Sequence, residues 1–433
     1  MKRVLVWIVA LAASFLTSAG LAEETPALVP HAPIWIDSND SFTKDNGVVA
    51  GKGTTADPFV IEGWLFEAGA TVIGSGMGIA DTDAYFVIRH CRFISMFDSP
   101  AVSLSRVSNG RVEDCTVEGT RISQCILLND STDCTIVRCD LTNTAQPAVI
   151  ALWGCTRITV TDNSIRSVRS WTSWCGIALW GTTSSHVSRN TITDCSTAIA
   201  LNRDVDRGLD STGNTVDSNT MSHSEGADIS VEETSIGNLF FHNNFGSYSG
   251  VSNVAPRGGN AWDNGSEGNR WGELGGWDPN GDGIDDVPYS IEGGDADRYP
   301  LMRPWRNGVV VLGVRLAGAD ERVTIRNWGQ SGVCLDGWKL ESMDTKTEAV
   351  LDSFPFAAGL TIPAGGTIVV HSGSASGGKA DDGLGTASAN LWSGWQQALQ
   401  GKDVWNDIGG TVRLVDADGR VVDELEYGWW MGS

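Results

Sequence analysis

Apolar residues recur along this chain with a period of about 24 residues. One register reads apolar, two residues, Cys or Asn, one residue, apolar, as in Ile88/Cys91/Phe93. Its central positions are Cys91, Cys115, Cys139, Asn163, Asn190, Asn219 and Asn243, which lie 24, 24, 24, 27, 29 and 24 residues apart. A second register of alternating apolar pairs runs between them: Val102/Leu104, Ile126/Leu128, Ile150/Leu152, Ile177/Leu179, Ile199/Leu201 and Ile229/Val231. Two interleaved registers with one period indicate one coil of a solenoid per repeat.

Within each register apolar and polar residues alternate, which is typical of strands with one buried face. One coil buries about six apolar side chains and gains roughly 9 to 18 kcal/mol. Ordering its backbone costs ~1 to 2 kcal/mol for each residue, which is more in total. Coils must therefore stack, at ~4.8 Å, so that each covers the next. The sequence predicts an all-β protein whose main part is a parallel β-helix, with the right-handed crossover that such connections prefer.

The central Cys or Asn position fits this stacking. Asparagines in one column can form a ladder of side-chain amides, and Cys91, Cys115 and Cys139 would fill the same column as small apolar groups. The chain has nine cysteines, an odd number. Disulfides are permitted in an exported protein, but neighbouring coils hold Cβ atoms slightly too far apart for a relaxed bridge. We expect mostly buried thiols, with disulfides as the alternative.

The N-terminus predicts export. Lys2 and Arg3 precede an apolar run over residues 4–16 and small residues up to Ala22, the pattern of a signal peptide over residues 1–22. The run is too short for a membrane anchor, and no later stretch could span a bilayer. We expect a secreted protein, extracellular or periplasmic, with no integral membrane segment in the mature chain.

The formal net charge is -23, and removal of Lys2 and Arg3 makes it -25 because residues 1–22 contain no acidic side chain. Such a surface repels nucleic acids and anionic lipids. Cations, neutral glycans and basic proteins remain as partners. The simpler interpretation of this charge is a solvated acidic coat or an adaptation to salt.

Several segments between residues 31 and 302 resemble NosD-like β-helix proteins. They are Ile34–Asp37, Gly51–Thr54, Asp57–Trp64, Asp83–Arg89 and Asn260–Trp271. The resemblance implies the pectin-lyase-like superfold, which polysaccharide lyases, hydrolases and non-enzymatic surface proteins share, so it does not fix an activity. The family also has a copper association. The six histidines are dispersed and there are only seven methionines, so the sequence gives copper little support.

A loop near the end of this region predicts a structural calcium site. Asp278, Asn280, Asp282 and Asp286 occupy positions 1, 3, 5 and 9 of the loop, and Ile284 would offer its carbonyl at position 7. Position 12 is Tyr289 rather than a bidentate Glu, so the loop is more similar to dockerin-type or thrombospondin-type repeats than to an EF-hand. Bound Ca2+ would neutralise crowded carboxylates where the β-helix is capped. The alternative is an Asp/Asn/Gly turn without metal.

Beyond Trp305 the period stops, and separate strands indicate a small sandwich. We expect strands at Val309–Val314, Arg322–Asn327, Trp338–Glu341, Thr367–His371, Thr411–Val415 and Val421–Leu425. Segments such as Val323–Asn327, Leu335–Leu340 and Ile362–Gly365 resemble a lamin tail domain over residues 308–428. Such an Ig-like module implies binding or attachment. The insertion Ser372–Gln400, with Trp392 and Trp395, has no derived role.

The sequence offers a candidate binding face but no catalytic centre. Trp153 and Trp180 directly follow the second register and should stack on neighbouring coils, while Trp171 and Trp174 lie in the loop between them. Arg203 and Asp204 follow on the next coil. Flat aromatic faces with polar edges suit sugar rings, but these tryptophans could equally shield a loop.

We expect a non-enzymatic protein that binds a polysaccharide or another cell-envelope component through this face. One alternative is a polysaccharide lyase or glycoside hydrolase of the same superfold, although the paired carboxylates of a hydrolase and the basic residue of a lyase are not recognisable. Another alternative is a purely structural component of the envelope.

Overall fold

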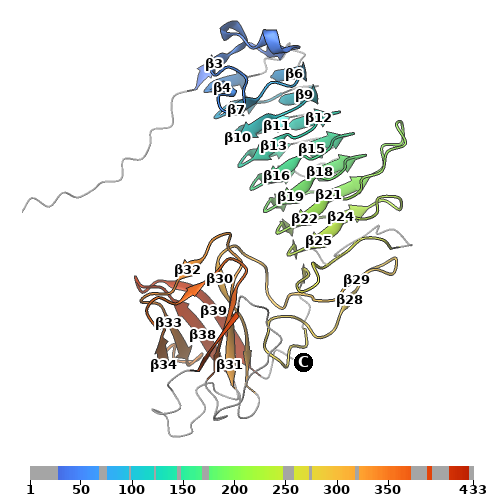
Figure 1. Cartoon of the computed structure of the whole chain (residues 1–433). Coiled ribbons are helices and arrows are strands. Elements are labelled where there is room, and N and C mark those ends of the chain that lie inside the picture. The colour runs from blue at the N-terminus through green and yellow to red at the C-terminus, as the bar shows by residue number, and fades with distance from the viewer. Residues whose placement is uncertain are drawn as a thin grey trace, which may run out of the picture.

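The computed structural model describes residues 28–67, 76–96, 99–120, 123–143, 148–167, 175–246, 258–272, 276–316, 321–371, 388–392 and 409–428. The expected signal peptide, Trp171, Trp174 and most of the insertion Ser372–Gln400 lie outside these ranges. The chain forms a parallel β-helix followed by a smaller module of mainly antiparallel sheets (Figure 1). The predicted all-β class is confirmed.

Three parallel sheets make up the β-helix. The ten-stranded sheet contains β1 (Val29–Pro30), β5 (Trp64–Glu67), β8 (Arg92–Ile94), β11 (Thr116–Thr120), β14 (Asp140–Asn143), β17 (Ser164–Ser167), β20 (Thr191–Thr193), β23 (Thr220–Ser222), β26 (Asn244–Phe245) and β27 (Arg270–Trp271). The nine-stranded sheet contains β3 (Val48–Ala50), β4 (Phe59–Glu62), β7 (Phe86–Arg89), β10 (Gly110–Glu113), β13 (Thr135–Val137), β16 (Thr159–Thr161), β19 (His186–Ser188), β22 (Thr215–Asp217) and β25 (Leu239–Phe241), with β3 antiparallel to β4. The eight-stranded sheet contains β2 (Ile34–Ile36), β6 (Met77–Thr82), β9 (Val102–Val107), β12 (Ile126–Asn129), β15 (Ala148–Trp153), β18 (Cys175–Trp180), β21 (Thr197–Asn202) and β24 (Ala227–Val231).

The first sequence register covers two of these sheets rather than one. Ile88 lies on β7 and Phe93 on β8, and Cys91 lies at the corner between them. The residue before the Cys or Asn turns the chain in the left-handed region, with φ of 49° at His90 and 51° at Asp114. Non-glycine residues adopt this conformation rarely, which is why the sequence pattern did not reveal the corner.

Two ladders of buried asparagine amides run through the β-helix. In the predicted ladder each Asn donates from its backbone N–H and its Nδ2 to Oδ1 of the Asn on the next coil, at 2.9 to 3.1 Å between Asn163 and Asn190 and between Asn243 and Asn269. It comprises Asn163, Asn190, Asn219, Asn243 and Asn269. A second ladder, which the sequence analysis missed, joins Asn214, Asn238 and Asn260.

Both ladders end on a carboxylate. Asn269 donates its backbone N–H to Asp297 at 2.7 Å, and Asn260 donates its own to Asp295 at 3.1 Å. A carboxylate accepts hydrogen bonds and does not donate, so it can terminate a ladder in which each Asn donates to Oδ1 of the Asn on the next coil. Asp297 is fully buried, and burial raises its pKa to about 6 although four N–H groups donate to it.

Three cysteines occupy the same column as the ladder asparagines, as the repeat pattern predicts. Cys91, Cys115 and Cys139 are buried above Asn163, whose Oδ1 accepts the backbone N–H of Cys139 at 2.9 Å. All nine cysteines are free thiols, and Cys334 is the exposed one. Burial raises the pKa of Cys155 and Cys195 to about 12. These thiols pack as small apolar groups and are not reactive nucleophiles.

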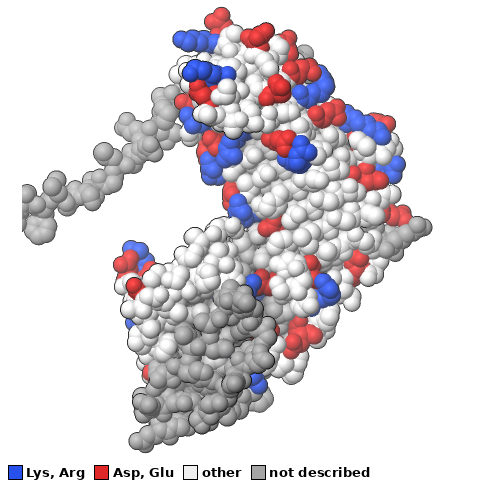
Figure 2. All heavy atoms as spheres, in the orientation of Figure 1, with Lys and Arg blue, Asp and Glu red and all other residues white. Residues whose placement is uncertain are grey.

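Oppositely charged side chains at the corners connect successive coils, and Figure 2 shows basic and acidic groups side by side along the β-helix. We call these contacts the Arg–Asp pairs. They are Arg106–Asp81, Arg138–Asp114, Arg157–Asp133 and Arg189–Asp162, with N–O distances of 2.6 to 2.8 Å. All eight residues have a left-handed backbone. The hydrogen bond from each Arg lowers the pKa of its Asp partner.

Aromatic residues close both ends of the β-helix. At the first coils, beside the short helices η1 (Asn39–Ser41) and η2 (Lys44–Asn46), Phe42 stacks on Phe59 with ring centroids 4.6 Å apart. At the last coils Phe245, Trp271 and Tyr289 stack in sequence. Tyr289 belongs to a hairpin of β28 (Tyr289–Ser290) and β29 (Ala296–Asp297). These rings cover apolar coil ends that would otherwise face water.

The C-terminal module has two four-stranded sheets around one core. One contains β30 (Val309–Arg315), β31 (Arg322–Asn327), β36 (Thr367–His371) and β37 (Ser388–Trp392). The other contains β34 (Val350–Pro355), β33 (Lys339–Met343), β38 (Gly409–Val415) and β39 (Val421–Gly428), and β32 (Val333–Cys334) pairs with β35 (Thr361–Ile362). Each of the six expected strands overlaps an observed one. The sequence analysis missed β32, β34, β35 and β37, which are short or lack apolar alternation.

Charged groups join this module to the last coils. Buried Glu267 lies 2.7 Å from His242 Nε2 and 2.7 Å from Arg326 on β31. Burial raises the pKa of Glu267, but the hydrogen bonds from His242 and Trp328 and the charges of Arg326 and His242 together lower it by more. On β39, buried Asp423 binds Arg303 at 2.9 Å. An apolar cluster of Leu301, Trp305, Val310, Leu312 and Trp328 lies in the same region.

The ladder predicts a specific stability defect. Asn219 is fully buried, donates to Val187 O and Asn243 Oδ1, and accepts from Asn190. Asn219→Ala leaves several buried groups unpaired, so we expect it to lower the free energy of unfolding by about 2 to 4 kcal/mol. Guanidinium titration followed by circular dichroism measures this. Thr191→Ala on the exposed face is the control, expected within about 0.5 kcal/mol of the unchanged protein, and equal midpoints for the two variants would contradict the ladder's role.

The Arg–Asp pairs predict a pH dependence. Their carboxyl pKa values are lowered in the folded state, so the pairs stabilise the fold above about pH 4 and lose that effect as the pH falls through the folded pKa. Asp133→Asn/Asp162→Asn should therefore lower the Tm at about pH 6, with a difference that shrinks towards about pH 2 and in high salt. Thermal melts across this range, with exposed Asp45→Asn as control, test the expectation. A difference that does not change with pH would refute it.

Candidate functional site

The predicted aromatic face forms on the eight-stranded sheet. Trp153 ends β15 and Trp180 ends β18, and the two residues are paired in register. Their ring centroids are 4.3 Å apart and the rings are stacked, with an interplanar angle of 14°. Outward residues in one column are held at the coil spacing of ~4.8 Å, so two neighbouring indoles must stack. Both indoles are half-buried, so part of each remains open to solvent.

Amide side chains lie on either side of the indole pair. Asn129 on β12 is in register with Trp153, and Asn202 on β21 is in register with Trp180. The next outward column consists of Ala151, Ala178 and Ala200, which belong to the same small apolar cluster as the tryptophans. The indole pair thus lies among small and polar neighbours.

The loop after Asn202 is fastened across several coils. Arg203 binds Asp210 at 3.1 Å, and buried Asp204 binds Arg207 at 2.7 Å. Arg207 also reaches Asp130, 77 residues earlier, at 3.1 Å. The loop passes closely over Gly181, because a Cβ atom at that residue would lie 2.7 Å from Leu209. Arg203 and Asp204 are therefore near the tryptophans as predicted, but their charges already have partners within the protein.

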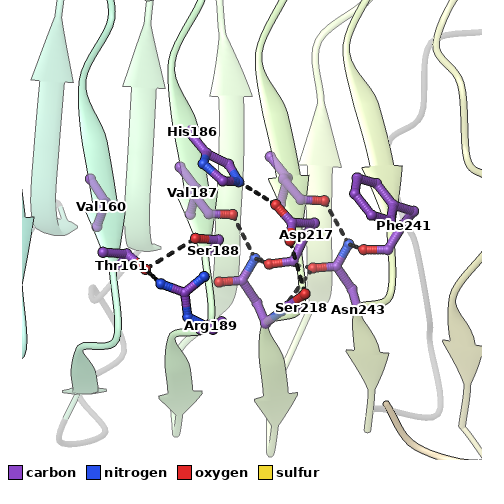
Figure 3. A network of polar contacts seen from close by, with 12 residues as sticks. Val160, Thr161, His186, Val187, Ser188, Arg189, Asp217, Ser218, Phe241 and Asn243 are labelled. Atoms are coloured by element: carbon purple, nitrogen blue, oxygen red, sulfur yellow. Dashed lines mark hydrogen bonds and ion pairs between the residues drawn. The ribbon is translucent and has the colours of Figure 1, made fainter. Parts of the chain in front are cut away.

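A histidine–aspartate contact on the nine-stranded sheet was not predicted. Figure 3 shows His186 on β19 pointing toward Asp217 on β22, and its Nε2 hydrogen-bonds to Asp217 Oδ1. Ser218 donates to the other carboxylate oxygen at 2.8 Å. Ser188, a potential nucleophile on the same strand as His186, is buried and shares a hydrogen bond with Thr161 at 3.0 Å. The coil register could have revealed the contact, since His186 aligns with Thr215, two residues before Asp217.

The predicted calcium loop is a tight turn. The Asp278 carboxylate accepts the backbone N–H groups of Gly281, Asp282 and Gly283 at 2.7, 3.2 and 2.9 Å. Burial, together with the charge of Asp282, raises the pKa of Asp278 to about 7, and burial also raises the pKa of Asp282. Asn280 Oδ1 accepts from Asp282 N at 2.8 Å.

The remaining predicted ligands lie on the same turn. Asp286 adds its negative charge close to Asp282, and Ile284 donates its N–H to the Asp282 carboxylate at 2.9 Å. Within the described ranges, no three His, Cys, Asp or Glu side chains already converge as a metal cage. The turn therefore holds the half-buried carboxylates of Asp278 and Asp282 beside exposed Asp286, and a cation would offset their mutual repulsion.

The same loop contacts the C-terminal module. Arg322 donates to the carbonyl of Asn280 at 2.9 Å, and Thr324 donates to that of Gly281 at 2.8 Å. A Cβ atom at Gly283 would lie 2.7 Å from Leu312 on β30. The loop is thus part of the contact between the β-helix and the sandwich.

Family models match both parts of the chain. Residues 68–276 match the family described as periplasmic copper-binding protein (NosD), and residues 306–428 match the lamin tail domain. The β-helix is therefore similar to the NosD family and the C-terminal module is similar to the lamin tail domain, in agreement with the sequence resemblances. A search of curated proteins found no match. None of the helices among the described residues has the length and apolar character needed to cross a membrane.

Solved structures with similarity to this chain are distant. The A-module of the mannuronan C-5 epimerase AlgE4 from Azotobacter vinelandii is 13% identical, with 49% of this chain and 87% of that chain covered and a TM-score of 0.26. A lacto-N-biosidase from Eubacterium ramulus is 9% identical, covering 57% and 56% with a TM-score of 0.29. The tailspike gp49 of the Acinetobacter baumannii bacteriophage Fri1, a capsular polysaccharide depolymerase, is 10% identical, covering 75% and 68% with a TM-score of 0.27. These similarities are too distant to indicate an activity.

Proposed function

We propose that this NosD-like β-helix is a secreted, non-enzymatic protein that binds a glycan or another cell-envelope component along the edge carrying Trp153 and Trp180. The lamin tail domain would serve as its attachment or interaction module. The observation that carries the proposal is the stacked, half-exposed indole pair on a rigid sheet. Aromatic rings with a polar N–H edge suit ligands that combine C–H faces with hydroxyl groups.

The surroundings of the pair support a neutral glycan. Asn129 and Asn202 offer amide donors and acceptors beside the two rings, which suits hydroxyl groups. Arg203 and Arg207 are occupied by Asp210, Asp204 and Asp130, so they have little charge to offer an anionic polymer. The overall charge of -23 also opposes polyanions.

The alternative is a polysaccharide-cleaving enzyme. His186 bonded to Asp217 is an acid–base pair that such an enzyme could use. Release of reducing ends or unsaturated products from cellulose, chitin or mannuronan, abolished by His186→Ala, would favour this alternative over a binding protein.

The binding proposal predicts a loss caused by Trp153→Ala/Trp180→Ala. With cellohexaose or chitohexaose in isothermal titration calorimetry, we expect binding by the unchanged protein. We expect the double variant to bind at least about tenfold more weakly, because an aromatic contact contributes roughly 1 kcal/mol or more. Trp277→Ala removes an exposed indole outside this face and is the matched control. If the double variant binds like the Trp277→Ala control, the indole pair is not the binding site.

We further propose that Ca2+ binds the loop of Asp278, Asn280, Asp282, Ile284 and Asp286 in a structural role. The donor set fits a hard cation, because it combines carboxylate, amide and carbonyl oxygens in a tight turn. Burial and neighbouring negative charge raise the pKa of Asp278 and of Asp282, which supports the proposal of a cation at this turn. Contacts of this loop with Arg322 and Thr324 mean that the ion would also support the joint with the lamin tail domain.

The calcium proposal predicts a rise in Tm on addition of CaCl2 to EDTA-treated protein, because a ligand of the folded state stabilises it. The rise should be absent in Asp278→Asn/Asp282→Asn and retained in Asp418→Asn, which alters an exposed turn elsewhere. Differential scanning fluorimetry measures it, and calorimetry with CaCl2 reports binding directly. The same Tm with CaCl2 and with EDTA, and no heat of binding, would exclude the site.

A further inference from the structure

A cleft of about 500 Å3 lies at the N-terminal end of the β-helix, away from the indole pair. Its lining includes Asn39, Lys52, Thr54, Phe59, Asp83 and Tyr85. These residues come from the η1 segment, the turn before β4 and the link between β6 and β7. The segments Gly51–Thr54, Asp57–Trp64 and Asp83–Arg89 were noted in the sequence only for their family resemblance, and their meeting was not predicted, because it happens only when the first coil is capped.

Hydrogen bonds hold the walls of this cleft in place. Asn39 Nδ2 donates to Asp83 Oδ1 at 2.8 Å, and Tyr85 N donates to Gly53 O at 3.1 Å. Gly53 packs directly on Phe59, since a Cβ atom there would lie 2.4 Å from the Phe59 ring. The cleft is therefore preformed, and a ligand would not have to order it.

The cleft offers groups that a sugar uses. Phe59 and Tyr85 are half-buried, so part of each ring is open to a ligand. Among the described residues, neither Asp83 Oδ2 nor the Tyr85 hydroxyl has a hydrogen-bond partner. One is an acceptor, and the other can donate or accept. Aromatic surface combined with convergent polar groups suits a hydroxylated ring.

Charge argues against a phosphate or another anion in this cleft. Lys52 is its basic residue, and it already pairs with Asp57 at 3.4 Å. Asp83 adds a negative charge to the lining. A neutral or basic ligand is therefore favoured over an anionic one.

The cleft lies along the same edge of the β-helix as the indole pair. One outward column of the eight-stranded sheet contains, on successive coils, Ala80, Ser105, Asn129 and Trp153. Ala80 and Trp153 are therefore three coil steps apart, or roughly 14 Å. Asp83 follows Ala80 by three residues. A chain of several sugar residues is long enough to contact both places.

We propose that this cleft is a second saccharide subsite, which binds one residue of a neutral oligosaccharide whose chain extends along the edge to Trp153 and Trp180. This inference rests on the proposed function and adds a second contact point to it. Asp83 would accept a hydrogen bond from a sugar hydroxyl, and Tyr85 would supply a ring face and its hydroxyl.

The test uses the full chain and calorimetry with cellohexaose, chitohexaose and, as the acidic comparison, mannuronate hexasaccharide. We expect a neutral hexasaccharide to bind more tightly than the mannuronate. Asp83→Ala and Tyr85→Phe should each weaken its binding by about fivefold to tenfold, the usual effect of one lost hydrogen bond. Asp40→Ala in the same cap, outside the lining, is the matched control, and thermal melts verify that each variant is folded.

The outcomes separate the two proposals. If Trp153→Ala/Trp180→Ala loses binding while Asp83→Ala and Tyr85→Phe bind like the control, the second subsite is wrong and the proposed function stands. If the cleft variants lose binding and the tryptophan variant does not, the cleft is the binding site and the indole pair is not. Failure of all three hexasaccharides to bind the unchanged protein overturns both.

Discussion

The structure depends on the in-register stacking of its coils. Each coil leaves polar backbone groups at its inner corners, and these must find partners inside the core. The asparagine ladders meet this requirement, because Asn190 and Asn219 each accept from the coil before and donate to the coil after. The apolar columns, the thiol column and the aromatic end groups can then pack around corners whose polar groups are hydrogen-bonded to these asparagines.

The same stacking explains the outer surface. Residues that share a column are kept about one coil spacing apart, so their chemistry repeats along the axis. Where oppositely charged residues follow one another on successive coils, they form the Arg–Asp pairs, which connect residues held in an unfavourable left-handed backbone. Two tryptophans in one column give the indole pair. The proposed glycan-binding edge is therefore a consequence of the repeat, and its rigidity comes from the core beneath it.

The features of the fold and of the candidate site that depend on the 24-residue period could be predicted from the sequence. Asn190 and Asn219 stand at the centre of a visible pattern, and Trp153 and Trp180 occupy equivalent places in it. The corners were missed because left-handed residues such as His90 and Asp114 are not glycines. The second ladder had a signal that was overlooked, since Asn214 and Asn238 each precede a ladder asparagine by five residues. The contact of Arg207 with Asp130 and the assembly of the N-terminal cleft depend on how loops fold back across coils, which no spacing in the sequence records.

The direction of the ladders determines where this protein can be lengthened. Each ladder asparagine donates to the side-chain oxygen of the next coil, so a whole coil with asparagines at both ladder positions could be inserted between the coils of Asn219 and Asn243 without changing the pattern. Asp295 and Asp297 cannot pass donors on, and a coil placed after them would begin with unmatched acceptors. The two aspartates therefore act as a stop, and an added coil would continue both ladders only on the N-terminal side of that stop.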